Sequence, residues 1–324
     1  MSNTTVTSRL LDGCGHCGKT ETLLPCTGCD AMLYCNQEHQ AAHVETHQQC
    51  CKSIKKCRKY CQKYEEASHQ NLPVDISLDQ YLDARMSWGY NLACLLTTRG
   101  HEEAIKHYME VLRLGRLGPG NSWFNIHRFI AWTLFELDKD HDCYDFITAW
   151  VTAACRESDL AEDTMLYTRF RRASLLEAVE LPWKSINDIR LVAPVILMKL
   201  KLLFDLQAMD TTTKVVGPKV PLEILDNIRF YVPSSSVILA NPELLRSNDH
   251  SATIVILQQQ TRSLYKKATE VRVHLTKELK QNDRHSIVSR HIKLDLEFSH
   301  NCWVVVPGAT DYINKLQAEM EKYV

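Results

Sequence analysis

Apolar residues recur every three or four positions over much of the chain beyond residue 52, which is the spacing of one face of an α-helix. The first stripe consists of Ile54, Cys57, Cys61 and Tyr64. The opposite face of this predicted helix is basic, with Lys55, Lys56, Arg58, Lys59 and Lys63. Asn71-Leu72-Pro73 then interrupts the pattern. We expect a domain boundary near residues 70–78.

Helical hairpins are predicted after this boundary. Residues 88–114 read as two helices with Gly100 at the turn between them. This segment resembles a tetratricopeptide repeat through Leu92, Ala93, Leu96, Gly100, Ala104 and Tyr108. A second pair is expected over 123–137 and 141–155, with its turn at 138–140. The pattern fits a plain helical bundle equally well, so both interpretations stay open.

The last part of the chain continues the helical pattern. Residues 181–206 contain few polar side chains and predict a buried hairpin element. A stripe formed by Leu257, Thr261, Leu264, Ala268, Val271, Leu275 and Leu279 favours a long helix docked on the core over an autonomous coiled coil. A final helix is expected over 309–323. The predicted fold is therefore mostly α, with a flexible N-terminus (1–13), a zinc finger (14–51), a basic helix and linker (52–78) and a helical domain (79–324).

Composition narrows the range of functions. The formal net charge of the 324 residues is −1, and binding of nucleic-acid phosphates across a whole face would need clustered Lys and Arg. The N-terminus has no apolar signal segment. The apolar run 189–206 carries Arg190, Lys199 and Lys201, which argues against a membrane span. We expect an intracellular protein in a reducing compartment, nuclear or cytoplasmic.

Eight potential zinc ligands lie within residues 14–51, in four close pairs. They are Cys14, Cys17, Cys26, Cys29, Cys35, His39, His47 and Cys51. Structural zinc sites take four Cys or His donors in a tetrahedron, so eight donors fill two sites and leave no position for water. The pattern predicts a closed module with two structural Zn²⁺ ions and no catalytic residue.

The spacing alone leaves two ways to combine the pairs. In a sequential scheme neighbouring pairs share an ion. In a cross-braced scheme the first pair joins the third and the second joins the fourth. Both schemes satisfy tetrahedral coordination, so the residues by themselves do not choose between them.

The whole pattern resembles a MYND-type zinc finger. Tyr34, Cys35, Gln40, His47 and Cys51 stand where that family has its corresponding residues. The resemblance implies the cross-braced scheme. Site one would then consist of Cys14, Cys17, Cys35 and His39, and site two of Cys26, Cys29, His47 and Cys51.

Two residues depart from the family pattern. His39 stands where most MYND fingers have a Cys, which would give a Cys3His site. Val44 replaces the usual aromatic residue, and this puts a partner groove at that place in doubt. His43 is the strongest spare donor, and Cys50 could replace Cys51 with strain. Cys57 and Cys61 are expected to pack as apolar residues.

The resemblance extends beyond the finger. Segments at 108–114, 143–146, 197–206, 249–251 and 303–309 are similar to a group of fungal MYND-finger proteins. MYND modules commonly bind short proline-containing peptides of partner proteins in transcriptional or chromatin settings. The resemblance therefore implies a zinc-binding protein–protein interaction module with a regulatory role and no enzymatic activity.

Three other interpretations have weaker support. A SET-type lysine methyltransferase would need an Asn-His-Ser-Cys-like motif and a Gly-Glu-Glu segment, and the nearest string, Ser299-His-Asn-Cys302, has the wrong order. A DNA-binding regulator could use the finger together with the basic helix Lys52–Lys63. The acidic turn between Asp138 and Asp145 could hold a cation, although such a cluster more often lies in a solvated loop.

Overall fold

The computed structural model describes residues 10–70, 76–115, 126–154, 174–177, 189–281, 303 and 305–322. Helices dominate these residues, and β1 (Leu24–Pro25) pairs antiparallel with β2 (Leu33–Tyr34) in the finger region. The predicted mostly α fold with a small N-terminal finger is confirmed. The chain divides into two compact units, Met1–Leu137 (unit 1) and Asp138–Val324 (unit 2). The predicted division at residue 78 stays a prediction.

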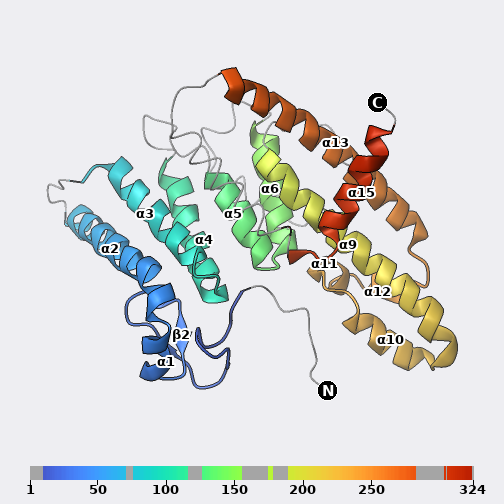
Figure 1. Cartoon of the computed structure of the whole chain (residues 1–324), viewed down its shortest axis with the longest axis horizontal. Helices are drawn as coiled ribbons and strands as arrows, with labels where there is room; N and C mark the ends of the chain where they lie inside the picture. The colour runs from blue at the N-terminus through green and yellow to red at the C-terminus, as the bar shows by residue number, and fades with distance from the viewer. Residues whose placement is uncertain are drawn as a thin grey trace. The chain divides into compact units, whose positions relative to one another are not determined.

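Unit 1 consists of the finger region and a row of helices. Its helices are α1 (Gln37–Ala42), α2 (Val44–His69), α3 (Leu78–Ala93), α4 (Thr98–Leu114) and α5 (Ile126–Glu136). Each of the helices from α2 to α5 packs on the next one (Figure 1). The α2 helix begins eight residues before the predicted start at Lys52. It therefore carries both His47 and Cys51 in its first turns.

The turn between α3 and α4 lies earlier than predicted. Thr97 caps α4 by accepting a hydrogen bond from the backbone N–H of Gly100, so Gly100 lies inside the first helical turn. A Cβ atom at Gly100 would lie 2.6 Å from the carbonyl oxygen of Leu92. Gly100 thus allows the end of α3 to approach α4 closely and does not form the turn itself.

Direct contacts join the finger to the helices of unit 1. The hydroxyl of Thr97 donates to the carbonyl oxygen of Ala31 over 3.1 Å. The backbone N–H of Leu11 donates to the carbonyl oxygen of Leu96 over 2.8 Å. Arg58 on α2 forms a 2.8 Å ion pair with Asp30. These contacts connect the stability of the finger with that of the α3–α4 turn.

Unit 2 is built on two long helices. Its elements are α6 (Asp140–Ala154), α9 (Ile189–Val216), η2 (Gly217–Lys219), α10 (Leu222–Tyr231), α11 (Ser236–Leu239), α12 (Pro242–Arg246), α13 (Ser251–Gln281) and α15 (Ala309–Glu321). The α13 helix packs along α9 (Figure 1). Leu257, Thr261, Leu264 and Ala268 are buried. The predicted docked helix is therefore confirmed for this part of the stripe.

A single helix covers the described part of the hairpin element predicted over 181–206. Residues 181–188 lie outside the described part of the chain, and residues 189–206 belong to the continuous helix α9. Side chains from Leu191 to Leu203 are buried, so the helix has no polar face and no periodic pattern to reveal it. Pro194 removes one backbone donor without ending the helix. None of the described helices, α9 included, combines the length and the apolar character that a membrane span requires.

The acidic turn before α6 binds a lysine of the same unit. Lys201 Nζ lies 2.8 Å from Asp138 and 3.0 Å from Asp140. Asp140 is only 1% exposed, so the expected solvated loop is wrong for this residue. Lys201 supplies the positive charge that a bound cation would otherwise contribute, and the turn becomes part of the core of unit 2.

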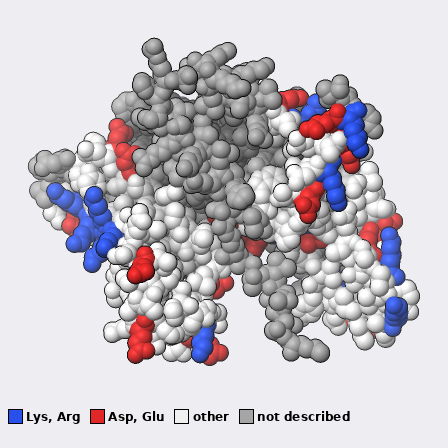
Figure 2. Space-filling model, in the orientation of Figure 1, with Lys and Arg blue, Asp and Glu red and all other residues white. Residues whose placement is uncertain are grey.

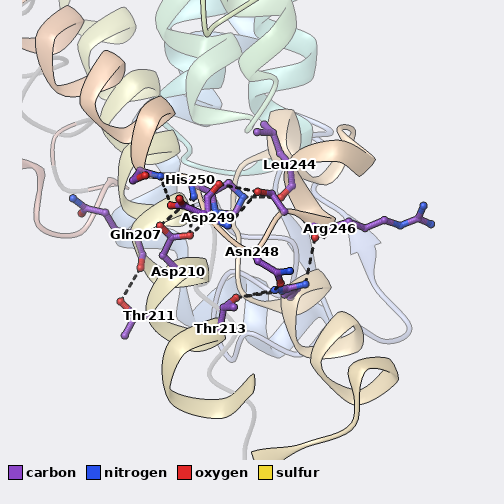
Figure 3. A network of polar contacts seen from close by, with 12 residues as sticks. Gln207, Asp210, Thr211, Thr213, Leu244, Arg246, Asn248, Asp249 and His250 are labelled. Atoms are coloured by element: carbon purple, nitrogen blue, oxygen red, sulfur yellow. Dashed lines mark hydrogen bonds and ion pairs between the residues drawn. The ribbon is translucent and has the colours of Figure 1, made fainter. Parts of the chain in front are cut away.

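A network of polar contacts holds the segment between α12 and α13 against α9 (Figure 3). His250 Nδ1 lies 2.6 Å from the Asp210 carboxylate, and His250 Nε2 lies 2.7 Å from the carbonyl oxygen of Leu244. Buried Arg229 donates to Thr213 over 3.1 Å and also to Asn248. Both ring nitrogens of His250 therefore contact groups of unit 2 itself.

Candidate metal centre

Two tight turns of nearly identical geometry present the Cys-x2-Cys pairs. The carbonyl oxygen of Cys14 accepts from the N–H of Gly18 over 2.8 Å, and that of Cys26 accepts from the N–H of Asp30 over 2.8 Å. Gly18 and Asp30 both have positive φ angles, of 73° and 59°. The residue after each second Cys therefore turns the chain through the left-handed region, which Gly and Asp tolerate best.

The other donors come from β2 and the two helices that follow it. Cys35 comes directly after β2, and His39 lies on α1. Asn36 begins α1, because its side chain accepts from the backbone N–H of His39 over 2.8 Å. His47 and Cys51 lie one helical turn apart on α2 and therefore face the same direction.

The structure gathers these eight side chains into two clusters. The first consists of Cys14, Cys17, Cys35 and His39, and the second of Cys26, Cys29, His47 and Cys51. Within each cluster the donor atoms all lie within 4.8 Å of one another. This grouping is the one that the MYND resemblance implies. That each donor ligates zinc stays a prediction.

The spacing of the donor atoms fits tetrahedral zinc. Bond lengths of about 2.3 Å to sulfur and about 2.0 Å to nitrogen place two sulfurs about 3.8 Å apart and a sulfur and a nitrogen about 3.5 Å apart. The sulfurs of Cys17 and Cys35 are separated by 3.5 Å and those of Cys26 and Cys51 by 3.8 Å. Cys14 Sγ and His39 Nδ1 are 3.5 Å apart, and Cys29 Sγ and His47 Nε2 are 3.6 Å apart. Both clusters could therefore hold the ion with little movement.

Backbone N–H groups favour the charged form of the first thiol. Burial acts to raise the pKa of Cys14, but hydrogen bonds from the backbone N–H groups of Cys17, Cys35 and His16 lower it to about 6. The thiolate is the form of cysteine that binds zinc. The turn that positions Cys14 thus also prepares it as a ligand.

Gln40 supports the second cluster from outside, and the Tyr34 ring packs edge-on against His47 of that cluster. The side-chain N–H of Gln40 donates to Cys26 Sγ over 3.6 Å, which gives this pattern residue a physical role that its position alone did not reveal. Burial raises the pKa of Tyr34, and burial also lowers the pKa of His43. The phenol therefore donates to the neutral His43 ring, 3.0 Å away at Nδ1. His43 belongs to neither cluster.

Cys50, Cys57, Cys61 and Val44 lie outside both clusters. Cys50 is half-buried beside Cys51, and Cys61 is fully buried on α2. Cys57 lies one turn before Cys61 and is also half-buried. Val44 is 48% exposed at the start of α2. The apolar packing expected for Cys61 is confirmed, and Val44 is free to contact a partner.

Gly28 is a residue of the site that the sequence pattern did not single out. A Cβ atom at this position would lie 2.4 Å from Cys51 Sγ. Its backbone φ angle is ordinary, so only the missing side chain matters. The sequence feature that could have indicated Gly28 is its position inside a Cys-x2-Cys turn, because such a turn wraps closely around its metal.

Replacing Gly28 with Ala is expected to push Cys51 away from the second cluster. The protein should then lose about one zinc equivalent of two, because three donors hold the ion far less tightly than four. Zinc content of the purified variant measures this. Gly18→Ala is the matched control, since its Cβ would meet nothing within 4 Å and only backbone strain of about 1 kcal/mol is added. Equal zinc loss in both variants would contradict the role of the Cys51 contact.

Comparison with known proteins identifies the module. Residues 14–51 match the family model of the MYND finger. Neither the curated proteins nor the solved structures give a match to the chain. The family consists of zinc-binding modules of protein interaction, and its match agrees with the two donor clusters. Residues 14–51 are therefore a finger for two zinc ions.

Proposed function

We propose that the protein is a non-enzymatic interaction protein whose finger binds a short segment of a partner protein. The observation that carries this proposal is the completeness of the two donor clusters. Each cluster contains four protein donors, whereas a catalytic zinc site keeps one position for water or substrate. The metal then has a structural role, and the exposed surface of the finger is what remains for function.

Exposed apolar side chains on the finger support a peptide partner. Leu24 on β1 is 59% exposed and Val44 is 48% exposed. These are the large hydrophobic residues that the finger presents to solvent. A partner that covered these two side chains would remove their apolar surface from water. A proline-containing segment suits this surface, because its preformed conformation loses little entropy on binding.

Affinity capture with the tagged, zinc-loaded protein tests the proposal. Replacing Leu24 and Val44 with Ser should remove most of the captured partners, because burying each apolar side chain contributes about 1.5–3 kcal/mol. The variant should keep two zinc equivalents, since neither residue belongs to a cluster. The captured proteins are identified by mass spectrometry and the interaction is remapped with synthetic peptides.

The matched control changes exposed apolar residues of unit 2. Val255 and Ile256 on α13 are 49% and 47% exposed, so their replacement with Ser removes a similar apolar area. Capture should survive in this control. Identical partner sets for the finger variant, the control and the wild type would contradict the proposal.

Several finer expectations remain part of the proposal. A regulatory role in transcription or chromatin and the similarity to fungal MYND-finger proteins rest on the resemblance of the sequence. A SET-type methyltransferase has less support, since that fold is rich in strands. In the part of the chain that the structure describes, β1 and β2 form the only sheet.

A further inference from the structure

Five exposed lysines form one line along α2. They are Lys52, Lys55, Lys56, Lys59 and Lys63, and we call them the lysine stripe. At 100° per residue they fall within about 100° of the helix circumference and extend over about 16 Å. Figure 2 shows Lys and Arg side chains gathered at the left of the molecule, where Figure 1 places α2.

The lysine stripe lies on the side of α2 opposite to its packed face. Ile54 and Cys61 are fully buried, and they lie about half a helical turn away from the stripe. Arg58, which lies on α2 outside the stripe, forms an ion pair with Asp30. The stripe therefore belongs to the solvent-facing side of α2.

Few contacts within the protein compensate these charges. Among the residues that the structure describes, none of the five lysines forms an ion pair, and Lys52 alone donates a hydrogen bond, to Gln48. The stripe contains five pairs of lysines at spacings of three or four residues. Like charges at these spacings destabilise a helix. An opposite charge on a partner would remove this penalty.

We propose that the lysine stripe binds an acidic segment of a protein partner. Exposed glutamates close the same face of α2 at both ends: Glu45 precedes the stripe and Glu66 follows it. The negatively charged part of a partner must therefore be no longer than the stripe. An acidic helix of about eleven residues has this length at 1.5 Å per residue.

Duplex DNA fits this surface less well than an acidic peptide. A duplex carries a negative charge about every 1.7 Å and continues beyond the stripe in both directions. It would bring phosphates against Glu45 and Glu66. The observations therefore favour carboxylates as the ligands of the stripe.

Fluorescence anisotropy with the zinc-loaded full chain tests this inference. The probe is a labelled Glu-rich peptide of about twelve residues, chosen to match the stripe in length. Changing Lys55, Lys56 and Lys59 to Gln should weaken its binding about tenfold, because three of the five exposed charge pairs with the peptide are lost. Lys214, Lys219 and Lys266 changed to Gln give the matched control, since these lysines are exposed on unit 2. Circular dichroism should be the same for both variants.

The outcomes separate this inference from the proposed function. Binding that is lost in the stripe variant and kept in the control supports the inference, even if the Leu24 and Val44 variant shows that the finger binds nothing. Equal weakening in stripe and control variants overturns it, as does a peptide with Gln at every Glu position that binds equally well. Tighter binding of a duplex of about 20 base pairs at the same salt concentration also overturns it and assigns the stripe to DNA.

Discussion

Removal of zinc by a chelator is expected to unfold residues 14–51 and to leave unit 2 folded. A segment of about 40 residues buries too little apolar surface to fold on its own. Structural zinc supplies about 10–16 kcal/mol per site in finger peptides at neutral pH. Removal of the metal therefore removes the free energy that stabilises the folded finger. Circular dichroism recorded together with zinc release should show loss of structure as two equivalents appear.

The contacts between the finger and α4 extend this effect beyond residue 51. Thr97 loses its acceptor at Ala31 when the finger unfolds, and Leu96 loses the N–H of Leu11. We therefore expect faster hydrogen exchange at the start of α4 in the chelated protein, whereas α9 and α13 keep their protection. Hydrogen exchange resolved by mass spectrometry measures both regions at once. Unchanged protection of residues 14–51 after complete zinc release would contradict the prediction.

Neighbouring cysteines provide a matched control for the metal effect. Cys51→Ser removes a member of the second cluster, whereas Cys50→Ser changes a residue that belongs to neither cluster. We expect Cys51→Ser to lose about one zinc equivalent and Cys50→Ser to keep two. Equal zinc content in the two variants would mean that Cys50 can replace Cys51 as a donor.

The finger was predictable from the sequence because zinc coordination requires particular residue types at short spacings. The eight donors were visible as four close pairs, but their spacing fitted two pairing schemes. The contact between Gln40 and Cys26 and the approach of Gly28 to Cys51 were not visible. They depend on how the two Cys-x2-Cys turns meet α1 and α2, which no local spacing encodes.

Helices were predictable where one face is polar and the opposite face is buried. The α2 and α13 stripes satisfy this condition. The α9 helix does not satisfy it. Its own apolar residues lie on all of its faces, so the sequence shows no helical periodicity there. The pair between Lys201 and Asp140 joins residues 61 positions apart in the chain. Such a contact follows from tertiary packing, so the acidic turn alone suggested a solvated loop.

Replacing Asp210 with Ala is expected to destabilise unit 2 by about 3–5 kcal/mol, the cost of removing one partner of a buried pair. The carbonyl oxygen of Leu244 can only accept, so His250 Nε2 carries a proton. His250 Nδ1 and the Asp210 carboxyl group share a hydrogen bond of 2.6 Å. Asp210 also accepts from the backbone N–H of His250 over 3.2 Å. The substitution leaves Nδ1 and the backbone N–H of His250 buried without their partner.

Graded variants distinguish lost contacts from a general loss of packing. Asp210→Asn keeps one oxygen that can accept from His250, so its cost should be smaller, about 1–3 kcal/mol. Glu319→Ala is the matched control, because both side chains of its ion pair with Arg262 are about half exposed and exposed pairs contribute about 0–1 kcal/mol. Hydrogen exchange of α9 amides gives the free energy of opening. Exchange in Asp210→Ala should be at least about thirtyfold faster than in Glu319→Ala, because the two costs differ by about 2 kcal/mol or more. Similar rates in the two variants would mean that the His250 pair does not hold α13 against α9.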